Sequence, residues 1–316
     1  MPRPSEIDDE TPVEETPTTE GLLGLPPLAI RLAAFGVVFA SLGVSWLGCG
    51  IYRGRLEQAI VRQVEAAGGH VIRDYQINIK ENPLRFEPKL LAVAEPPWLD
   101  QLLGVPFQSR IVCAHAGFEG FQPTLVKQIA RLRHLQQLGL WNTELDASAL
   151  ESIARMPALR EIELHWPWLT PQELEFLGRS ETIESIQLHN NCATDALVAE
   201  VVHFPGLKKI MVSGPRVTGR SIAPLAECPQ LQSIELRDIS GISPEELRPL
   251  IDLPDLKTLA LKGCGVDANA YPVLAQLPAL QSLTILGANY DTNLPAIAPP
   301  IHSLEEMRLR YEGSSP

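Results

Sequence analysis

Apolar residues in the second half of the chain recur with a period of 24 or 25 residues. Segments such as ALREIEL, TIESIQL and QLQSIEL share three aliphatic positions in the pattern Leu-x-x-Leu-x-Leu. The first of these positions is Leu135, Leu159, Ile183, Leu207, Leu231, Leu256, Leu280 and Leu304 in successive copies. The second and third positions are apolar in every copy as well. The pattern therefore predicts short strands that stack side by side into a parallel sheet.

The second half of each repeat predicts a short return helix on the outer side. A residue that favours a helix N-cap follows each strand, namely Asp146, Thr170, Thr194, Thr218, Ser243, Asp267 and Asp291. Glu173 and Glu246 stand three residues after their caps, as in a capping box. Pro224, Pro249 and Pro272 lie inside the return and lack a backbone N–H, so we expect short or partly 3₁₀ helices there.

An uncharged apolar segment, residues 32–52, precedes the repeats. As a helix rising about 1.5 Å per residue it would be about 31 Å long, which matches the hydrocarbon thickness of a bilayer. Arg31 and Arg53 flank the segment, and Trp46 and Tyr52 lie towards its second boundary, where aromatic rings favour the membrane interface. We therefore expect a retained membrane anchor.

Two alternatives to a retained anchor stay open. A cleaved signal peptide would begin with basic residues, whereas residues 1–20 are acidic and predict a disordered tail. A lipoprotein signal would place a lipid on Cys49, but Trp46 and Leu47 stand where small residues are expected. The retained anchor fits the sequence better than either alternative.

The side of the membrane that holds the repeats is indicated by the flanking basic residues. Arg53, Arg55 and Arg62 follow the apolar segment, and only Arg31 closely precedes it. The positive-inside rule therefore favours a cytoplasmic repeat domain, and an N-terminal tail left in the cytoplasm is the competing arrangement.

Residues 53–134 do not show the repeat pattern and predict a block of mixed elements. Leu56, Ile60 and Val64 lie on one helix face, which Gly68-Gly69 ends. Alternation over residues 70–79 predicts a strand, residues 98–103 predict a short amphipathic helix, and residues 111–116 predict a second strand. We expect this block to cap the first core layer of the solenoid.

The repeats resemble the leucine-rich-repeat superfamily, in its short form with a threonine- or aspartate-capped helix. With the helix, Gly-Gly, strand and Trp-Leu block before the repeats, residues 53–311 also resemble membrane-anchored repeat proteins of planctomycete-type bacteria. The resemblance implies an α/β leucine-rich-repeat solenoid, with a curved parallel sheet inside and short helices outside, preceded by a single transmembrane helix. The expected layout is a tail over 1–24, the transmembrane helix over 25–52, the block over 53–134, the repeats over 135–311 and a tail over 312–316.

Charge and cysteine usage narrow the function. The formal net charge is −12, whereas a nucleic-acid-binding protein is typically basic, so we expect no nucleic-acid partner. The five cysteines, Cys49, Cys113, Cys192, Cys228 and Cys264, show no close pairs, so we expect buried thiols rather than disulfides or a zinc site. Because no nucleophile motif, Walker loop or dinucleotide fingerprint is present, we expect a binding module rather than an enzyme.

The strand residues that point away from the core predict the binding face. We expect a concave-face patch with aromatic and basic anchors, the residue types that dominate protein interfaces. Its candidate partner-binding residues are Trp141, His165, Trp166, His189, Arg237, Lys262 and Arg310. The expected partner is an unidentified protein, and self-association as a structural protein of the cell envelope is the alternative.

His165 and His189 raise a separate question of metal binding. They occupy the same position of neighbouring strands, about 4.8 Å apart, and Glu163 lies on the same face. A His-His-Glu metal site is one hypothesis, and an exposed polar face with two histidines is the other. Because ligand geometry cannot be obtained from spacing, we expect the polar face, with no metal and no cofactor.

Overall fold

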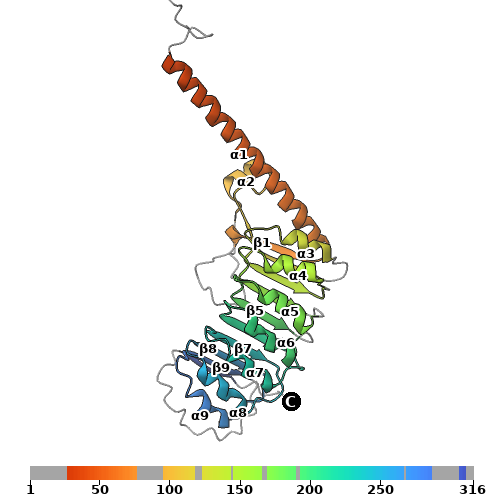
Figure 1. Ribbon diagram of the computed structural model, residues 1–316, viewed down its shortest axis with the longest axis vertical. Helices are drawn as coiled ribbons and strands as arrows, with labels where there is room; N and C mark the ends of the chain where they lie inside the picture. The colour runs from red at the N-terminus through yellow and green to blue at the C-terminus, as the bar shows by residue number, and fades with distance from the viewer. Residues whose placement is uncertain are drawn as a thin grey trace, which may run out of the picture. The chain divides into compact units, whose positions relative to one another are not determined.

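The computed structural model describes residues 27–76, 95–117, 123–143, 145–165, 169–189, 193–266, 268–286 and 306–310. The chain divides into two units, residues 1–53 and residues 54–316. The expected tails over 1–24 and 312–316 lie outside the described residues. The leucine-rich-repeat solenoid predicted from the 24-residue period is confirmed in the second unit (Figure 1).

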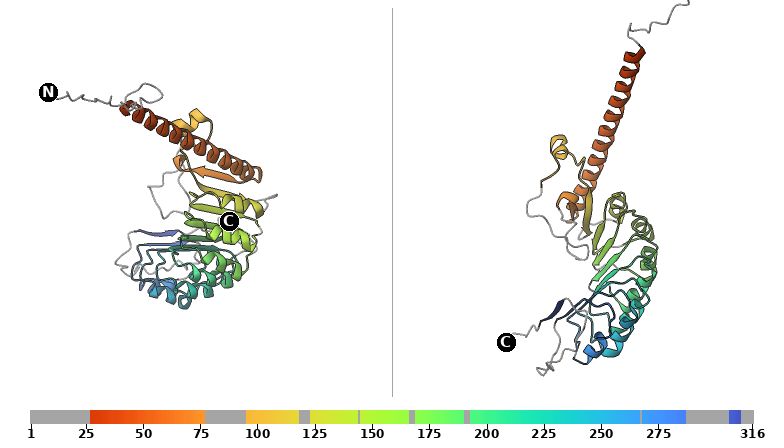
Figure 2. Two further views of the ribbon diagram at one scale, coloured as in Figure 1. Left: turned by 45° about the horizontal axis from the view of Figure 1, so that its top comes forward. Right: turned by 90° about the vertical axis from the view of Figure 1, so that its left-hand side faces the viewer.

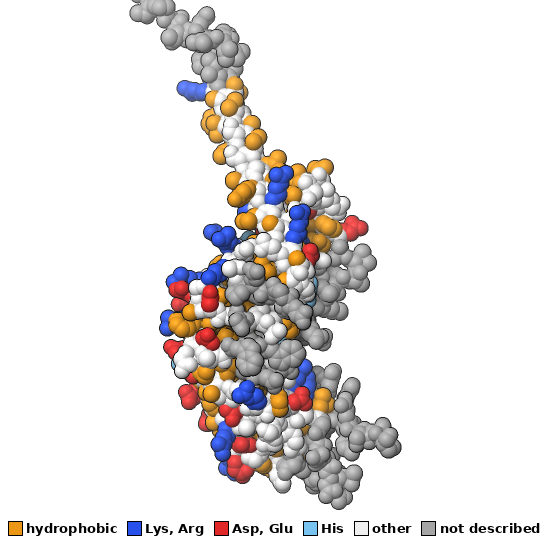
Figure 3. Space-filling view, turned by 90° about the vertical axis from the view of Figure 1, so that its right-hand side faces the viewer, with side chains coloured by type: hydrophobic (Ala, Val, Ile, Leu, Met, Phe, Trp, Pro, Cys, Tyr) orange, Lys and Arg blue, Asp and Glu red, His pale blue; other side chains and the backbone are white. Residues whose placement is uncertain are grey.

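Helix α1, Pro27–Ala66, contains the apolar segment and continues beyond it. Its stretch from Arg31 is long and apolar enough to cross a membrane, and residues 32–49 of the apolar segment are exposed. Hydrophobic side chains cover this helix, and Lys and Arg side chains flank the apolar stretch (Figure 3). The sequence predicted two separate helices. Nothing between Tyr52 and Leu56 breaks the backbone hydrogen bonding, so one helix runs to Ala66 and ends before Gly68, whose φ is +77°.

The described strands of the second unit form one ten-stranded sheet in chain order. Strand β1 pairs antiparallel with β2, and β2 to β10 pair in parallel. The strands are β1 His70–Arg73, β2 Ile111–Gly117, β3 Gln137–Trp141, β4 Glu161–His165, β5 Ser185–His189, β6 Lys209–Ser213, β7 Ser233–Arg237, β8 Thr258–Lys262, β9 Ser282–Leu286 and β10 Glu306–Arg310. The repeat register is kept throughout, so that Leu138 pairs with Ile162 and Ile162 with Ile186.

Short helices cover the outer side of the repeats, and the strands line the inner side of the curve (Figure 2). The α-helices are α3 Pro123–Ile129, α4 Ala147–Ala154, α5 Pro171–Gly178, α6 Asp195–Ala199, α7 Ile222–Leu225, α8 Pro244–Leu247 and α9 Tyr271–Leu274. The 3₁₀ turns are η3 Glu200–His203, η4 Gly219–Ser221, η5 Arg248–Asp252 and η6 Ala268–Ala270. The prediction that Pro224, Pro249 and Pro272 shorten their helices is confirmed: α7, α8 and α9 have four residues each.

The helix caps form as the sequence predicts where the structure describes them. Side-chain oxygens of Asp146, Thr170, Thr194, Thr218 and Ser243 accept hydrogen bonds from the backbone of the first turn. Both expected capping boxes, Thr170 with Glu173 and Ser243 with Glu246, are complete. The caps expected at Asp267 and Asp291 lie outside the described residues.

The core lies between the sheet and the outer helices. The second and fourth residues of the repeat strands, such as Leu138 and Leu140, are fully buried, as are the first aliphatic positions Leu135 and Leu159. At the N-terminal end, Ile60 and Val64 of α1 join the same core. The predicted strand over 70–79 is shorter than expected: β1 ends at Arg73 and the 3₁₀ turn η1, Asp74–Gln76, follows, while residues 77–79 lie outside the described residues.

A single carboxylate organises the turn between helix α2, Trp98–Leu103, and strand β2. The buried Asp100 side chain accepts hydrogen bonds from the backbone N–H groups of Phe107, Gln108 and Ser109 at 2.8, 2.6 and 3.1 Å. Burial would raise the pKa of Asp100, but these bonds outweigh it and lower the pKa. With its own carboxylate facing inwards, α2 turns Trp98 and Leu102 to the outside, where 67% and 71% of each residue is exposed.

Candidate functional site

The concave face is built from the first, third and fifth residues of each repeat strand. Because side chains alternate along a strand, these residues point away from the core that the second and fourth residues fill. The parallel register places equivalent residues of adjacent strands side by side. His165 thus pairs with Trp141 on one side and with His189 on the other.

Five aromatic rings make a continuous row on the first strands of this face. The ring centroids of His70 and His115 are 4.6 Å apart, and those of His115 and Trp141 are 4.8 Å apart. Trp141 stacks on His165 at 5.1 Å, and His165 stacks on His189 at 3.9 Å with their planes 7° apart. We call these residues and Glu163 the histidine cluster.

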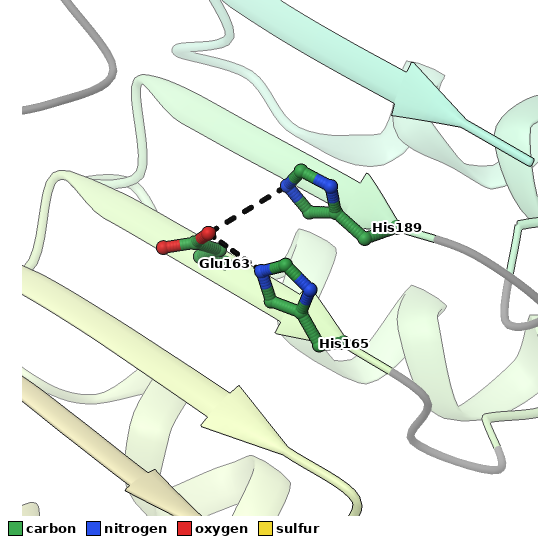
Figure 4. A group of neighbouring side chains, drawn as sticks. All are labelled: Glu163, His165 and His189. Atoms are coloured by element: carbon green, nitrogen blue, oxygen red, sulfur yellow. Dashed lines mark hydrogen bonds and ion pairs between the residues drawn. The ribbon is translucent and has the colours of Figure 1, made fainter. Parts of the chain in front are cut away.

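Glu163 is the polar centre of the histidine cluster. Its Oε1 accepts a hydrogen bond from His165 Nε2 at 2.6 Å and lies 3.6 Å from His189 Nε2 (Figure 4). Its Oε2 lies 3.5 Å from His115 Nε2. His115 Nδ1 is in turn hydrogen-bonded to His70 Nε2 at 2.9 Å, so a neutral His115 that donates to Glu163 accepts from His70. One carboxylate thus joins histidines from three strands, and a fourth histidine supports them.

The absence of a side chain at Gly139 lets His115 reach Glu163. Strand β3 lies between the strands that carry these two residues, and Gly139 is the register partner of both. A Cβ at position 139 would come within 2.2 Å of His115 Cδ2. The His115 ring therefore fills the space above β3 that a side chain would otherwise occupy.

The charges of the cluster follow from burial and from these contacts. Burial alone would raise the pKa of Glu163, but the hydrogen bonds and charges of His115 and His165 lower it to about 2. Burial lowers the pKa of His189 to about 4, and repulsion by His165 adds to the effect. Burial and the neighbouring His115 also lower the pKa of His70. At neutral pH the ionised carboxylate of Glu163 therefore faces a neutral imidazole at His189, and His70, behind His115, is neutral as well.

Polar contacts continue from the cluster across the next strands. The Oε1 atom of Gln187 lies 3.2 Å from His189 Nε2. The Nε2 atom of Gln187 donates a hydrogen bond to Glu161 Oε1 at 2.5 Å. Burial raises the pKa of Glu161 to about 7, although the bond from Gln187 and the charge of Lys209 oppose the rise. Gln187 therefore couples the cluster to a second half-buried carboxyl group.

A separate charged group lies on β7 and β8. The buried Glu235 Oε1 accepts from Arg237 Nε at 2.6 Å and from Lys262 Nζ at 2.5 Å. These two cations are thus held in place by a carboxylate, and their side chains stay partly exposed, at 39% and 31%. This triad is the basic part of the predicted binding patch.

The structure brings some predicted site residues together and leaves others apart. Trp141, His165 and His189 meet in one stack, and Arg237 and Lys262 share Glu235. Trp166 lies outside the described residues. Arg310 is the last residue of β10 and the register partner of Leu286, and its side chain is not described.

Sequence reasoning missed His70 and His115, which belong to the block before the repeats. The 24-residue period could have placed His115. The residues Ile111, Ala114 and Ala116 stand 24 positions before Leu135, Leu138 and Leu140. Alanine replaces the larger aliphatic residues there, so the strand was not counted as a repeat. Extending the period back by one copy places His115 in the same row as Gly139 and Glu163.

Comparisons with known proteins give distant likenesses to solved structures. No protein-family model matches the chain, and no curated protein matches it. Among solved structures, the chain is similar to an internalin from Listeria monocytogenes at 14% identity, over 58% of this chain and 70% of that one, with a TM-score of 0.39. It is also similar to the Rad7 and Elc1 complex of yeast at 13% identity, over 61% and 68%, with a TM-score of 0.29. At these values neither likeness carries a partner or an activity over to this chain, and the resemblance to planctomycete-type membrane proteins stays a prediction.

Proposed function

We propose that the chain is a membrane-anchored scaffold that binds a partner protein on the concave face of its repeats. The observation that carries this proposal is the row of neighbouring rings from His70 to His189, on the side of the strands opposite the core. The side chains of His165 and His189 keep 17% and 13% of their surface exposed, although they stack on each other. Rigid aromatic side chains that lose little entropy on binding are common anchors of protein interfaces.

The charged triad of Glu235, Arg237 and Lys262 supports the same role. Its members are fixed by short ion pairs before any partner arrives, so binding would order few additional side chains. The triad lies two strands beyond His189 along the sheet, since β6 separates β5 from β7. An aromatic patch beside an ordered polar patch is the usual composition of a protein interface.

The membrane anchor in this proposal is the apolar part of α1. Its exposed apolar side chains need a nonpolar environment, which a bilayer provides. Within the second unit, a Cβ on Gly54 of α1 would come within 2.6 Å of Pro106 O, so the turn after α2 packs closely on that part of the helix. Because Gly54 stands only two residues after the apolar segment, which ends at Tyr52, we propose that Trp98 and Leu102 of α2 enter the membrane interface.

A structural role through self-association is the second candidate. Among the described strands β10 stands last in the sheet, and an edge strand can pair with another chain. Enzymatic activity is the least supported role, because the sequence contains no nucleophile or cofactor-binding motif.

The proposal is tested by substituting the central ring without disturbing the core. Full-length chain is isolated from gently solubilised membranes as wild type, Trp141→Ala, Trp141→Phe and Arg155→Ala, and associated proteins are quantified. Arg155 lies on the outer side, at the end of α4, and pairs only with Glu151 of the same helix among the contacts described. We expect one set of proteins to be lost with Trp141→Ala and kept with Trp141→Phe and Arg155→Ala. Equal recovery by all four chains contradicts binding through the concave face, and recovery of the chain alone supports self-association.

A further inference from the structure

We infer that Glu163, His165 and His189 form a binding site for a divalent transition metal ion such as Zn²⁺. The three ligand atoms, one carboxylate oxygen and two imidazole nitrogens, lie within 4.8 Å of one another. This inference goes beyond the proposed partner binding and does not depend on it, because the three ligands all come from this chain.

The direction of the donor atoms supports the site. His165 and His189 project from the ends of neighbouring strands, and each turns a ring nitrogen towards the carboxylate of Glu163 (Figure 4). Both nitrogens are Nε2, and both face the same oxygen, Oε1, at 2.6 and 3.6 Å. Two ring nitrogens from neighbouring strands thus converge on one carboxylate oxygen. His189 Nε2 also lies 3.2 Å from Gln187 Oε1, and it would leave that amide when the ion binds.

The spacing of the donors is close to that of a bound metal ion. Ligand atoms about 2.1 Å from a tetrahedral Zn²⁺ lie about 3.4 Å from one another. His189 Nε2 and Glu163 Oε1 already have nearly this separation, and His165 Nε2 lies closer. A small rotation of the His165 and His189 rings, which now stack in parallel, would let both nitrogens point at one ion. The ion would take the place of the proton between His165 Nε2 and Glu163 Oε1. A neutral His165 would then carry its proton on Nδ1, and an imidazolium would release one proton to solvent.

A second histidine pair fixes the orientation of the Glu163 carboxylate. Its second oxygen, Oε2, faces His115 Nε2 at 3.5 Å, and His115 is hydrogen-bonded to His70. Ligands of metal ions are commonly oriented by such outer hydrogen bonds. His115 and His70 would therefore hold the carboxylate while Oε1 binds the ion.

The donor set indicates the class of metal. Two imidazoles with one carboxylate favour Zn²⁺ and its neighbours over Mg²⁺ and Ca²⁺, which prefer oxygen ligands. Three protein ligands leave a fourth position for water or for a group from another molecule. The side chains are partly exposed, so this fourth position is reachable from the concave side.

The test measures metal binding by the full-length chain, purified in detergent without a histidine tag and stripped with a chelator. Zn²⁺ is titrated by calorimetry, and bound zinc is counted by mass spectrometry after dialysis. We expect one zinc ion per chain, which excess Mg²⁺ or Ca²⁺ does not displace. Co²⁺ bound in place of zinc should show the visible absorption of a four-coordinate, tetrahedral site.

Variants identify the ligands. We expect the double variant His165→Ala/His189→Ala to lose zinc and Glu163→Gln to bind at least about tenfold more weakly. The matched control is His203→Ala, because His203 is also paired with a glutamate, Glu200, at 3.2 Å, but on the outer side of the repeats. Circular dichroism checks that each variant is folded, and His165→Gln replaces any alanine variant that is not.

Three results would overturn the inference. They are no zinc bound by the wild type, zinc binding that the double variant keeps, and zinc binding that His203→Ala loses instead.

Discussion

The His115 ring occupies the space that a side chain at Gly139 would fill. A Cβ at residue 139 would lie 2.2 Å from His115 Cδ2 and 3.0 Å from the Trp141 ring, so both rings would have to move. This relationship explains how a histidine on β2 contacts a glutamate on β4 across the strand between them.

Gly139→Ala should therefore destabilise the repeat unit. Forcing an extra methyl group into a filled space costs about 1–3 kcal/mol, and the contact between His115 and Glu163 would be lost as well. Denaturant unfolding of the solubilised chain measures the change. Gly241→Ala is the control, because no other atom lies within 4 Å of a Cβ placed there, and it should change the stability by less than about 0.5 kcal/mol. Equal stability of the two variants would show that the position of the His115 ring does not require a glycine at residue 139.

Much of the repeat architecture was predictable from the sequence because it depends on local spacing. The columns that begin at Leu135 and Leu138 repeat at the period of the strands, and each cap precedes its own helix. These features need only the identity of a residue and its distance along the chain.

The histidine cluster was only partly predictable. His165 and His189 are one period apart, so their proximity follows from the parallel register. The contact between His115 and Glu163 depends on two further facts, the pairing of β2 with β3 and the empty space at Gly139. The support from His70 depends on the antiparallel pairing of β1, which no repeat spacing indicates.

Asp100→Asn should loosen the turn between α2 and β2. The charged carboxylate accepts three backbone hydrogen bonds. A hydrogen bond to a charged group stabilises a folded protein by about 1.5–3 kcal/mol. Hydrogen exchange at Phe107, Gln108 and Ser109 should become faster at neutral pH. Asp252→Asn, which changes an exposed carboxylate, should leave this segment unchanged.

The stability that Asp100 contributes should depend on pH. Its pKa in the folded chain is lowered, so the unfolded chain binds the proton first as pH falls. The contribution is complete above the unfolded pKa of about 3.9 and is lost as pH falls through the lower folded pKa. The difference in thermal midpoint between wild type and Asp100→Asn should thus be constant at neutral pH and shrink below about pH 4. A difference that stays the same in acid would contradict the role of the carboxylate.

The apolar part of α1 should hold the chain in the membrane. Replacing Phe39 and Val44 by arginine places two charges in the middle of the segment, each unfavourable by about 2.5–3.5 kcal/mol for insertion. Wild type should stay in the membrane pellet after alkaline extraction, and the double variant should move to the supernatant. The control replaces Glu151 and Glu227, two exposed residues of the repeats, by arginine. A wild-type chain that alkali extracts would rule out an integral anchor.

Helix α2 should contact lipid through Leu102. A polarity-sensitive dye on Leu102→Cys, in a Cys49→Ser/Cys192→Ser background, should shift to shorter emission wavelengths when the chain is placed in lipid nanodiscs. The same dye on Arg155→Cys should show a water-like spectrum, because Arg155 is exposed on the outer side of the repeats. A water-like spectrum at both positions would remove α2 from the membrane interface.

The most direct test of partner binding is photo-crosslinking in native membranes from residue 141. A benzophenone amino acid replaces Trp141 of the concave face or, as the outward control, the exposed Glu151 of α4. If the concave face binds a partner, irradiation gives an adduct between this chain and a different protein from position 141 and not from position 151. Adducts from position 151 alone, or no adduct with another protein from position 141, would contradict the account.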